Sequence, residues 1–270
     1  MHTALTIAGS DSSGGAGVQA DLKTFSSLDV YGLTAITALT AQNTVEVSAV
    51  HYATPEIVAK QIDAVLSDIP VEACKTGMLG TAALVRVVAE RLASHGVKQL
   101  VVDPVLLSKS GAALLTDDAV DVLVETLLPQ ALVVTPNVPE AERLTGVKIA
   151  CPDDMLQAAA HLLKTGAEFI VIKGGHLEGD ATDLVYTKDT HHFLRAARII
   201  TRSTHGTGCT FSAAITAYLA KGLAPLDAIK CAKTYITQAI LTAPELGKGY
   251  SPTNHFWNRQ NDAGYPPDTA

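Results

Sequence analysis

Long apolar runs are absent from this chain of 270 residues, and none approaches the roughly 18 residues that a transmembrane helix needs. Charged residues are also scarce, at 17% against 47% apolar residues, which is the opposite of the balance that keeps a chain disordered. Basic residues do not dominate, because 20 lysines and arginines face 27 acids and leave a net charge of −7. We therefore expect a soluble protein with a large core and no general affinity for nucleic acid or membranes.

Cysteines are few and scattered. The four of them, Cys74, Cys151, Cys209 and Cys231, form no CxxC pair, and no histidines stand at metal-site spacing from them. Free thiols suit a reducing compartment. The first residues carry no basic segment, and the apolar stretch at 4–8 is too short for a signal peptide. These observations favour a cytoplasmic protein.

Short β-branched and aliphatic runs alternate with longer amphipathic stretches almost from end to end. The expected strands are residues 5–8, 34–39, 72–75, 99–102, 132–135 and 169–172, and the expected helices are residues 55–68, 81–95, 117–128 and 153–165. This alternation is typical of βαβ crossovers, and nearly continuous apolar runs are typical of strands that are buried on both faces. The fold class is therefore α/β, with a mostly parallel central sheet.

The pattern changes after residue 183. Two or three short strands, among them residues 184–186 and 192–194, predict a short antiparallel edge within residues 183–200, and two helices follow at 208–221 and 225–242. No linker-like tract of glycine, serine or proline divides the chain. We expect a single domain over residues 1–257 and a polar C-terminal tail over residues 258–270.

Residues suited to chemistry gather where the expected strands end. Glycine, proline or charged side chains follow five of the strands, at residues 9–17, 75–79, 103–105, 135–140 and 173–176. In an open parallel sheet, ligands bind beyond the carboxyl ends of the strands. One such segment alone is most often a plain turn, but five together indicate a binding crevice.

A dinucleotide site is one interpretation of the first glycine-rich segment, because Gly15, Gly17 and Ala20 fit the G-x-G-x-x-A pattern. The glycines of that pattern begin about six residues beyond the strand, and no acidic residue closes the second strand to hold a ribose. A P-loop is excluded, because the G-x-x-x-x-G-K-S/T pattern does not occur.

The most informative segment, residues 204–212, leads into an alanine-rich helix. Gly206 and Gly208 permit a tight turn whose N–H groups converge at the helix N-terminus, where the helix dipole also favours an anion. Such positioning and charge stabilisation are what phosphoryl transfer requires. Cys209 has two interpretations here: a thiol with a lowered pKa, partly thiolate at neutral pH, or a small buried helix residue.

Together these segments resemble the ribokinase superfamily, and within it the hydroxymethylpyrimidine and phosphomethylpyrimidine kinases of thiamine biosynthesis. The resemblance extends from residue 5 to about residue 256. Its motifs are GSDSSGGAGVQADLK at residues 9–23, AQNT at 41–44, KTGML at 75–79 and GTGC at 206–209. The resemblance implies a three-layer α/β/α sandwich, which agrees with the alternation of strands and helices.

The resemblance also implies MgATP-dependent phosphorylation of 4-amino-5-hydroxymethyl-2-methylpyrimidine, and then of its monophosphate, to give the diphosphate. On the substrate side it implies that Asp21, Gln42 and Met78 line the pyrimidine pocket, and that Gly9 and Val105 offer backbone contacts. A glutamine amide suits an aminopyrimidine edge because it both donates and accepts hydrogen bonds. Taken by themselves, these residues have equally good structural interpretations. Asp21 is compatible with an acid in the first turn of a helix, Gln42 with a loop glutamine and Met78 with a core methionine.

On the nucleotide side, the resemblance implies that Lys173 contacts the phosphates of ATP. Glu140, in an Asn137-x-x-Glu140 motif, would support Mg²⁺ through water, with Asp103 close to the same region. One or two carboxylates suffice, because Mg²⁺ keeps several of its waters. Taken alone, Glu140 is compatible with an ordinary residue of a helix start.

The resemblance assigns the anion hole to the amides of Gly206, Thr207, Gly208 and Cys209, with Thr207 also at the nucleotide. Most relatives in the superfamily carry Asp where Cys209 stands, as the base for the substrate hydroxyl. Our hypothesis is that the first acceptor, an alcohol, gains from a thiolate base, whereas the second acceptor is already an anionic phosphate. A fixed aspartate would repel that phosphate, whereas a thiol can stay neutral.

The main alternative is a pyridoxal kinase of the same lineage, which shares the Cys-bearing turn and the glycine-rich loop. The motif at residues 41–44 and the presence of Lys173 favour the pyrimidine kinase, although activity on both alcohols is compatible with the motifs. Two alternatives from other classes are a non-catalytic vitamer-binding protein and a nicotinamide oxidoreductase. Binding of the pyrimidine without ADP production would indicate the former, and retention on a dinucleotide matrix the latter.

Several features stay open at this level. Ser251 stands where the family usually has the last glycine of a C-terminal loop, which leaves the contacts of that loop open. Residues 10–16 and 105–112 are candidates for a lid over the substrate. His205 either orients the anion turn or is a simple loop histidine. The same two interpretations apply to His176. His191 and His192 fit strand or turn positions.

Family members are commonly homodimers, and the expected sheet edge at residues 183–194 is a candidate for pairing between two chains.

Overall fold

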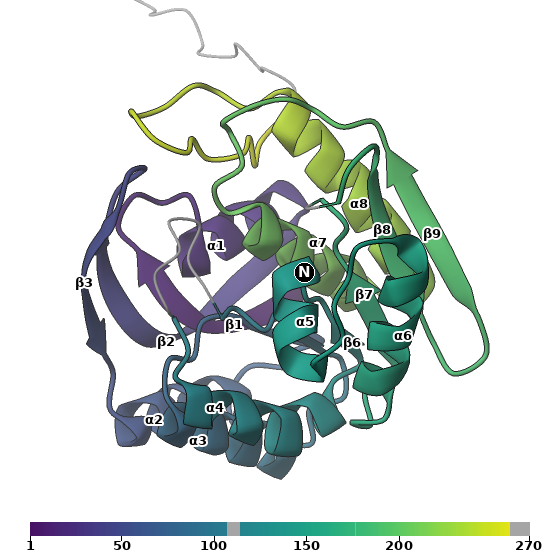
Figure 1. Ribbon diagram of the computed structural model, residues 1–270. Helices are drawn as coiled ribbons and strands as arrows, with labels where there is room; N and C mark the ends of the chain where they lie inside the picture. Colours follow the sequence, from purple (N-terminus) through teal and green to yellow (C-terminus); the bar gives the residue numbers. More distant parts are fainter. Residues whose placement is uncertain (107–113, 176, 260–270) are drawn as a thin grey trace, which may run out of the picture.

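A computed structural model describes residues 1–106, 114–175 and 177–259. Within these ranges nine strands form one sheet in the order β3-β2-β1-β4-β5-β6-β7-β8-β9 (Figure 1). The strands are β1 (His2–Asp11), β2 (Val30–Gln42), β3 (Val47–Tyr52), β4 (Ala73–Thr76), β5 (Leu100–Val102), β6 (Val133–Val134), β7 (Phe169–Ile172), β8 (Ala181–Tyr186) and β9 (His191–Ala196). Strands β2, β1, β4, β5, β6 and β7 run parallel, and β8 and β9 form an antiparallel edge. The expected sheet is confirmed.

Helices cover both faces of this sheet, which gives three layers. They are α1 (Gly17–Ser27), α2 (Pro55–Leu66), α3 (Ala82–Ser94), α4 (Asp117–Val122), α5 (Val138–Thr145), α6 (Pro152–Leu163), α7 (Thr207–Ala220) and α8 (Pro225–Leu241). One buried cluster joins the sheet to α1, α7 and α8, and a second joins it to α2 to α6. None of the helices in the described ranges is both long enough and apolar enough to cross a membrane.

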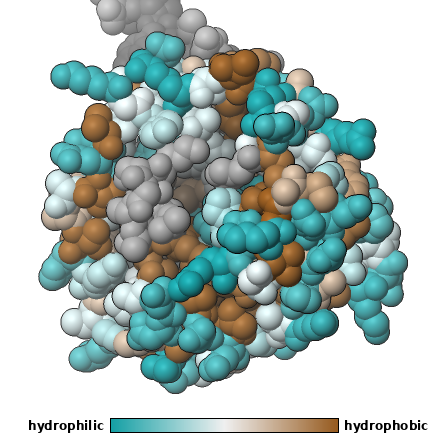
Figure 2. Space-filling model, in the orientation of Figure 1, coloured by the Kyte–Doolittle hydropathy of each residue, from teal (hydrophilic) through white to brown (hydrophobic). Residues whose placement is uncertain are grey.

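The antiparallel strand β3, at the other end of the sheet, was not expected from the sequence. Asn43 forms the turn that precedes it, because its Oδ1 accepts hydrogen bonds from the N–H groups of Val45 and Glu46. The residues of β3 are mostly exposed, so the strand lacks the apolar run that marks a buried one. Leu39, Val45 and Val50 are exposed at or near this edge, and Figure 2 shows apolar side chains along the left margin, where Figure 1 places β3.

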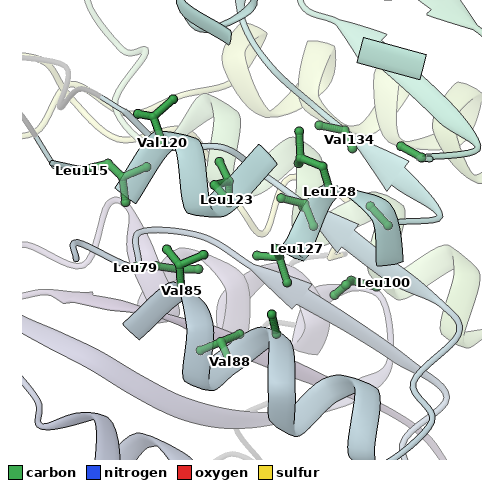
Figure 3. Close-up of a cluster of buried hydrophobic side chains, with 14 of the residues drawn as sticks. Leu79, Val85, Val88, Leu100, Leu115, Val120, Leu123, Leu127, Leu128 and Val134 are labelled. Atoms are coloured by element: carbon green, nitrogen blue, oxygen red, sulfur yellow. The ribbon is translucent and has the colours of Figure 1, made fainter. Parts of the chain in front are cut away.

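The helix expected at residues 117–128 is interrupted. Helix α4 ends at Val122, a π-helical turn spans Leu123–Leu127, and a 3-10 turn spans Leu128–Gln130. Pro129 has no N–H group to continue a helical ladder, so the helix cannot extend regularly through it. The side chains of this segment still pack on α3, and Figure 3 shows Leu123 and Leu127 opposite Val85 and Val88.

Side chains alternate along the central strands between the two buried clusters. In β5, Leu100 and Val102 belong to the cluster with α2 to α6, and Val101 belongs to the cluster with α1, α7 and α8. In β7, Ile172 and Val171 divide in the same way. Because successive residues of a strand point to opposite faces and both faces are covered, these two strands are apolar throughout.

The order of the strands reverses at β1, which lies between β2 and β4. The chain leaves β1 toward one side of the sheet and returns through β4 on the other side. A crevice forms at the carboxyl ends of the strands where this reversal occurs. Strand β1 ends there at Asp11 and β4 at Thr76, so the segments that follow them face the same region.

Candidate active site

The anion turn, residues 206–209, begins helix α7. Gly206 is the N-cap, with a left-handed φ of +75°, and its backbone packs on the glycine-rich loop after β1. A Cβ at this position would lie 1.7 Å from the carbonyl oxygen of Gly15, so only glycine fits. No side chain caps this helix. The N–H of Thr207 donates to the carbonyl oxygen of Thr204 at a long 3.4 Å, and the N–H groups of Gly208 and Cys209, which follow it in the first turn, are suited to an anion.

Lys173 follows β7 and brings its ammonium to this turn. Its Nζ lies 3.0 Å from Oδ1 of Asp103, 4.0 Å from Oε2 of Glu140, and 3.2 Å from the place where a Cβ of Gly208 would be. Burial alone would lower the pKa of Lys173, but Asp103 and Glu140 raise it, so the side chain is an ammonium ion. The structure thus brings Lys173, Asp103, Glu140 and Gly208 into one cluster.

Asp103 stands at the end of β5 with 2% of its surface exposed. Besides Lys173, its carboxylate accepts hydrogen bonds from the hydroxyls of Thr135 and Ser212, each at 3.2 Å. Burial alone would raise the pKa of Asp103, but the attraction of Lys173 and Lys75 and these hydrogen bonds bring it below its ordinary value. Asp103 is therefore ionised.

Glu140 and Asn137 cap helix α5. The amide oxygen of Asn137 accepts from the N–H of Glu140 at 2.9 Å, and the carboxylate of Glu140 accepts from the N–H of Asn137 at 2.7 Å. Burial raises the pKa of Glu140 to about 7, with Asp103 adding to the rise and Lys173 opposing it. The cap fixes Glu140 beside Lys173, and the amide oxygen of Asn137 is already used by the cap.

Lys75 opens the KTGML motif at residues 75–79, but its partner does not follow from the sequence. It lies in β4, and its Nζ is 2.7 Å from Oδ1 of Asp21, with both side chains completely buried. Thr6 on the neighbouring strand donates to Oδ2 of the same carboxylate at 2.6 Å. Burial would lower the pKa of Lys75, but the charge of Asp21 raises it above its ordinary value. A lysine inside a four-residue buried strand was the signal that could have revealed it.

The same contacts place Asp21 behind the substrate side rather than on it. Its two carboxylate oxygens are engaged by Lys75 and Thr6, and its side chain has no exposed surface. A direct contact between Asp21 and a substrate would require this ion pair to open, and it stays a prediction. In the structure, Asp21 holds the ammonium of Lys75.

Cys209 lies in the first turn of α7, near both lysines. Burial raises the pKa of its thiol to about 11; Lys75 opposes this rise, and Asp21 and Asp103 add to it. The interpretation of Cys209 as partly thiolate at neutral pH is therefore wrong. The helix N-terminus does favour a thiolate, but burial beside two carboxylates outweighs that effect.

The remaining substrate-side residues lie at the ends of β1, β2 and β4. The Sδ atom of Met78 is 3.1 Å from the place where a Cβ of Gly9 would be, so these two residues are in contact. Gln42 ends β2 and is partly exposed, with its Nε2 3.4 Å from Nε2 of His205. The N–H of Val105 donates to the carbonyl oxygen of Asp103 at 2.9 Å, which forms a tight turn after β5.

Ser251 closes the C-terminal loop. Its hydroxyl donates to the carbonyl oxygen of Leu246 at 2.7 Å and accepts from the N–H of the same residue at 3.0 Å. The carbonyl oxygen of Ser251 accepts from the N–H of His205, next to the anion turn. The serine therefore adds two hydrogen bonds that a glycine could not make.

Of the two lid candidates, residues 10–16 are held in place by hydrogen bonds to Asp11 and from Lys23 to Gly14. Most of the second candidate, residues 107–112, lies outside the described residues, as do His176 and the part of the tail from residue 260 on. His191 and His192 lie in β9.

Phosphoryl transfer needs amide donors and a cation around the moving phosphate, together with a crevice that holds the acceptor. The anion turn, Lys173 and the strand ends supply these at the reversal point of a parallel sheet, which defines the class of protein as a kinase for small molecules. A family model described as phosphomethylpyrimidine kinase matches residues 11–254. The chain belongs to this phosphomethylpyrimidine kinase family.

Relatives support this assignment over the whole chain. The hydroxymethylpyrimidine/phosphomethylpyrimidine kinase of Bacillus subtilis is 48% identical over 263 residues, covering 97% of each chain. The thiamine biosynthesis bifunctional protein ThiED of Geobacter sulfurreducens is 51% identical, covering 93% of this chain and 52% of that protein. The crystal structure of an ADP complex of Bacillus subtilis pyridoxal kinase is 42% identical, with a TM-score of 0.91 over 97% of this chain and 100% of that one.

Proposed function

We propose that this kinase phosphorylates 4-amino-5-hydroxymethyl-2-methylpyrimidine with MgATP, and then its monophosphate, to give the diphosphate used in thiamine biosynthesis. The observation that carries the proposal is the approach of the Lys173 ammonium to Gly208 in the anion turn. A phosphoryl group held there would meet an amide cradle on one side and a buried cation on the other. The names of the relatives in the family support the choice of a pyrimidine.

The pyrimidine would lie at the ends of β1, β2 and β4. The partly exposed amide of Gln42 would read the aminopyrimidine edge, since it offers both a donor and an acceptor. Gly9 and Met78, which are in contact, would form the wall behind the ring, and Val105 would contribute its backbone. Asp21 would contribute through the buried ammonium of Lys75.

ATP would place its phosphates between Lys173 and the amides of residues 206–209, with Thr207 at the N-terminus of α7. Asn137 would contribute by holding Glu140 in the cap that faces this cluster.

Mg²⁺ fits the acidic part of the cluster. Asp103 and Glu140 are buried carboxylates that share Lys173 as their near cation, which leaves one negative charge uncompensated when both are ionised. No group of three acidic, histidine or cysteine side chains suited to a metal occurs among the described residues, and Mg²⁺ bound to nucleotide phosphates needs only one or two carboxylates. Glu140 and Asp103 would hold the ion, which would supply charge neutralisation at the phosphates.

Cys209 would act as the base for the first phosphorylation. The hydroxymethyl O–H bond breaks, the proton passes to the thiolate of Cys209, the oxygen bonds to the γ-phosphorus and ADP leaves. With a pKa of about 11, the thiol supplies only a small thiolate fraction at neutral pH, and the nearby Lys75 ammonium is the charge that favours it. The second acceptor, a phosphate, needs no base.

Pyridoxal phosphorylation is a second candidate, because the fold also matches the pyridoxal kinase of Bacillus subtilis. Both substrates are flat aromatic rings that bear a hydroxymethyl arm. The deciding experiment compares kcat/KM for the pyrimidine alcohol and for pyridoxal under saturating MgATP. A preference for the pyrimidine supports the proposal, and a clear preference for pyridoxal overturns it.

We also propose a cytoplasmic homodimer, with residues 1–257 as one domain. Three exposed apolar residues, Leu39, Val45 and Val50, lie at or near the β3 edge, whereas none of the large exposed apolar residues lies within β9, so β3 is the better candidate for pairing between chains. Light scattering on the purified protein and on a Val50→Lys variant tests this: a dimer that becomes a monomer is expected, and a monomeric parent protein contradicts it.

A further inference from the structure

His205 occupies a central position that the proposed chemistry does not use. It precedes the anion turn and has 6% of its surface exposed. Its Nε2 lies 2.7 Å from Oδ2 of Asp11, a residue 194 positions away at the end of β1. Its backbone N–H donates to the carbonyl oxygen of Ser251 in the C-terminal loop. One residue thus joins three segments that are distant in the sequence.

Asp11 in turn organises the glycine-rich loop, residues 12–16. Its Oδ1 accepts from the N–H and the hydroxyl of Ser13, and its Oδ2 accepts from the N–H of Ala16, each at 2.8 Å. Burial alone would raise the pKa of Asp11, but the hydrogen bonds from His205 and Ser13 outweigh it and lower the pKa below its ordinary value. The loop is therefore hydrogen-bonded to the carboxylate of Asp11, and the same carboxylate pairs with His205.

The loop and the anion turn also touch directly at two glycines. A Cβ at Gly15 would lie 2.4 Å from Cδ2 of the His205 ring, and a Cβ at Gly206 would lie 1.7 Å from the carbonyl oxygen of Gly15. Such distances leave no room for a side chain at either position. The imidazole of His205 therefore packs directly on the glycine-rich loop.

Gln42, which would read the pyrimidine, meets the same imidazole. Its Nε2 lies 3.4 Å from Nε2 of His205, which is a packing contact and not a hydrogen bond, because that imidazole N–H is donated to Asp11 and an amide nitrogen cannot accept. The backbone of Gln42 exchanges hydrogen bonds with the hydroxyl of Ser12 in the glycine-rich loop. The hairpin that carries Gln42 is held again at Thr44, whose carbonyl oxygen and hydroxyl accept from N–H groups of the C-terminal loop. The backbone around Gln42 is thus linked to the two segments that His205 contacts, the glycine-rich loop and the C-terminal loop.

We propose that His205 is a positioning residue for the pyrimidine substrate: through Asp11 it fixes the glycine-rich loop, and with that loop the backbone of Gln42, relative to the anion turn. This inference rests on the proposed function, since it assigns Gln42 to the pyrimidine. Its action is on the substrate side, because its ring contacts Asp11, Gln42 and Gly15.

The test is a His205→Ala variant, assayed for KM of the pyrimidine alcohol and of ATP separately, and for pyrimidine binding by calorimetry. Loss of a hydrogen bond to a charged group predicts a KM and a dissociation constant for the pyrimidine raised roughly 10- to 100-fold. The KM for ATP should change by less than about twofold. Equal increases in both KM values would indicate general loosening of the anion turn and overturn the proposal.

The matched control is His95→Ala. His95 forms a similar pair with Asp63, at 2.8 Å, on helices α3 and α2 away from the site, so both KM values should stay unchanged. His205→Gln keeps a donor for Asp11 and should recover most of the pyrimidine affinity. This variant also allows the test if His205→Ala proves unstable. In the double variant Asp11→Ala/His205→Ala, the loss should not exceed the larger single loss. Additive losses, or no recovery by glutamine, would contradict the coupling.

The outcomes also separate this inference from the proposed function. If the parent protein binds and phosphorylates the pyrimidine but His205→Ala behaves like His95→Ala, only the role of His205 fails. If the parent protein neither binds nor phosphorylates the pyrimidine, the proposed function fails and the inference with it.

Discussion

The ammonium of Lys75 lies 2.7 Å from a carboxylate oxygen of Asp21, and neither side chain has any exposed surface. Removing one partner of such a pair leaves a buried charge without compensation, which typically costs about 3–5 kcal/mol. We therefore expect Lys75→Met to lower the free energy of unfolding by that order, measured by urea denaturation. Lys60→Met is the control, because its pair with Glu56 is exposed and worth no more than about 0.5 kcal/mol.

A second prediction concerns the same pair when both charges are removed. In Lys75→Met/Asp21→Leu neither charge of this pair remains, so part of the lost stability should return. A double variant as unstable as Lys75→Met alone would show that packing, and not the unpaired carboxylate, causes the loss.

The pH dependence of the two phosphorylations tests the role of Cys209. A base works in its deprotonated form, and the thiol pKa of about 11 lies above the usual assay range. The rate of the first phosphorylation should therefore rise by about tenfold per pH unit between pH 7 and 9 at saturating MgATP. The second phosphorylation should show no such rise, and Cys209→Ala should impair the first step more than the second. A flat profile for the alcohol, or equal losses in both steps, contradicts the base role.

Glu140 gives a pH-dependent effect on stability. Its pKa in the folded protein is about 7, against 4.5 for an ordinary glutamate, so over this window the folded state holds a proton that the unfolded chain has released. The free energy of unfolding should fall as the pH rises from 4.5 to about 7. Without Mg²⁺, Glu140→Gln should be more stable than the parent protein at pH 8 by about 1–3 kcal/mol and no more stable at pH 4. Denaturation at the two pH values is the measurement, and an equal difference at both would disagree with the raised pKa.

Two glycine substitutions test the anion turn. Gly206→Ala places a Cβ against the carbonyl oxygen of Gly15 at a positive φ, and should reduce kcat/KM by about 100-fold or more. Gly175→Ala is the matched control in the neighbouring loop, since a Cβ there meets nothing within 4 Å, and its activity should be preserved. Equal activity in the two variants would show that phosphoryl transfer does not depend on the anion turn.

The sequence predicts most of the architecture because strands and helices alternate with strong periodicity. Strand β3 escapes prediction because an exposed edge strand carries no apolar run. The π-helical turn at Leu123–Leu127 escapes because the apolar spacing continues through it. The apolar pattern of the sequence indicates which residues are buried. These two features depend instead on backbone hydrogen bonding.

The site is predictable where a motif sits at a strand end, as for Lys173 and the anion turn. The role of Lys75 is not, because its partner Asp21 lies 54 residues away and only the fold brings the two together. The same holds for the thiol of Cys209, whose surroundings depend on carboxylates from two other segments. Charges that meet through tertiary structure leave no local signal.

The most direct test is to follow the purified protein with MgATP and 4-amino-5-hydroxymethyl-2-methylpyrimidine by phosphorus NMR. The account predicts that a monophosphate resonance appears first and is then replaced by a diphosphate, with two ADP formed per pyrimidine. Consumption of pyridoxal but not of the pyrimidine under the same conditions would contradict it.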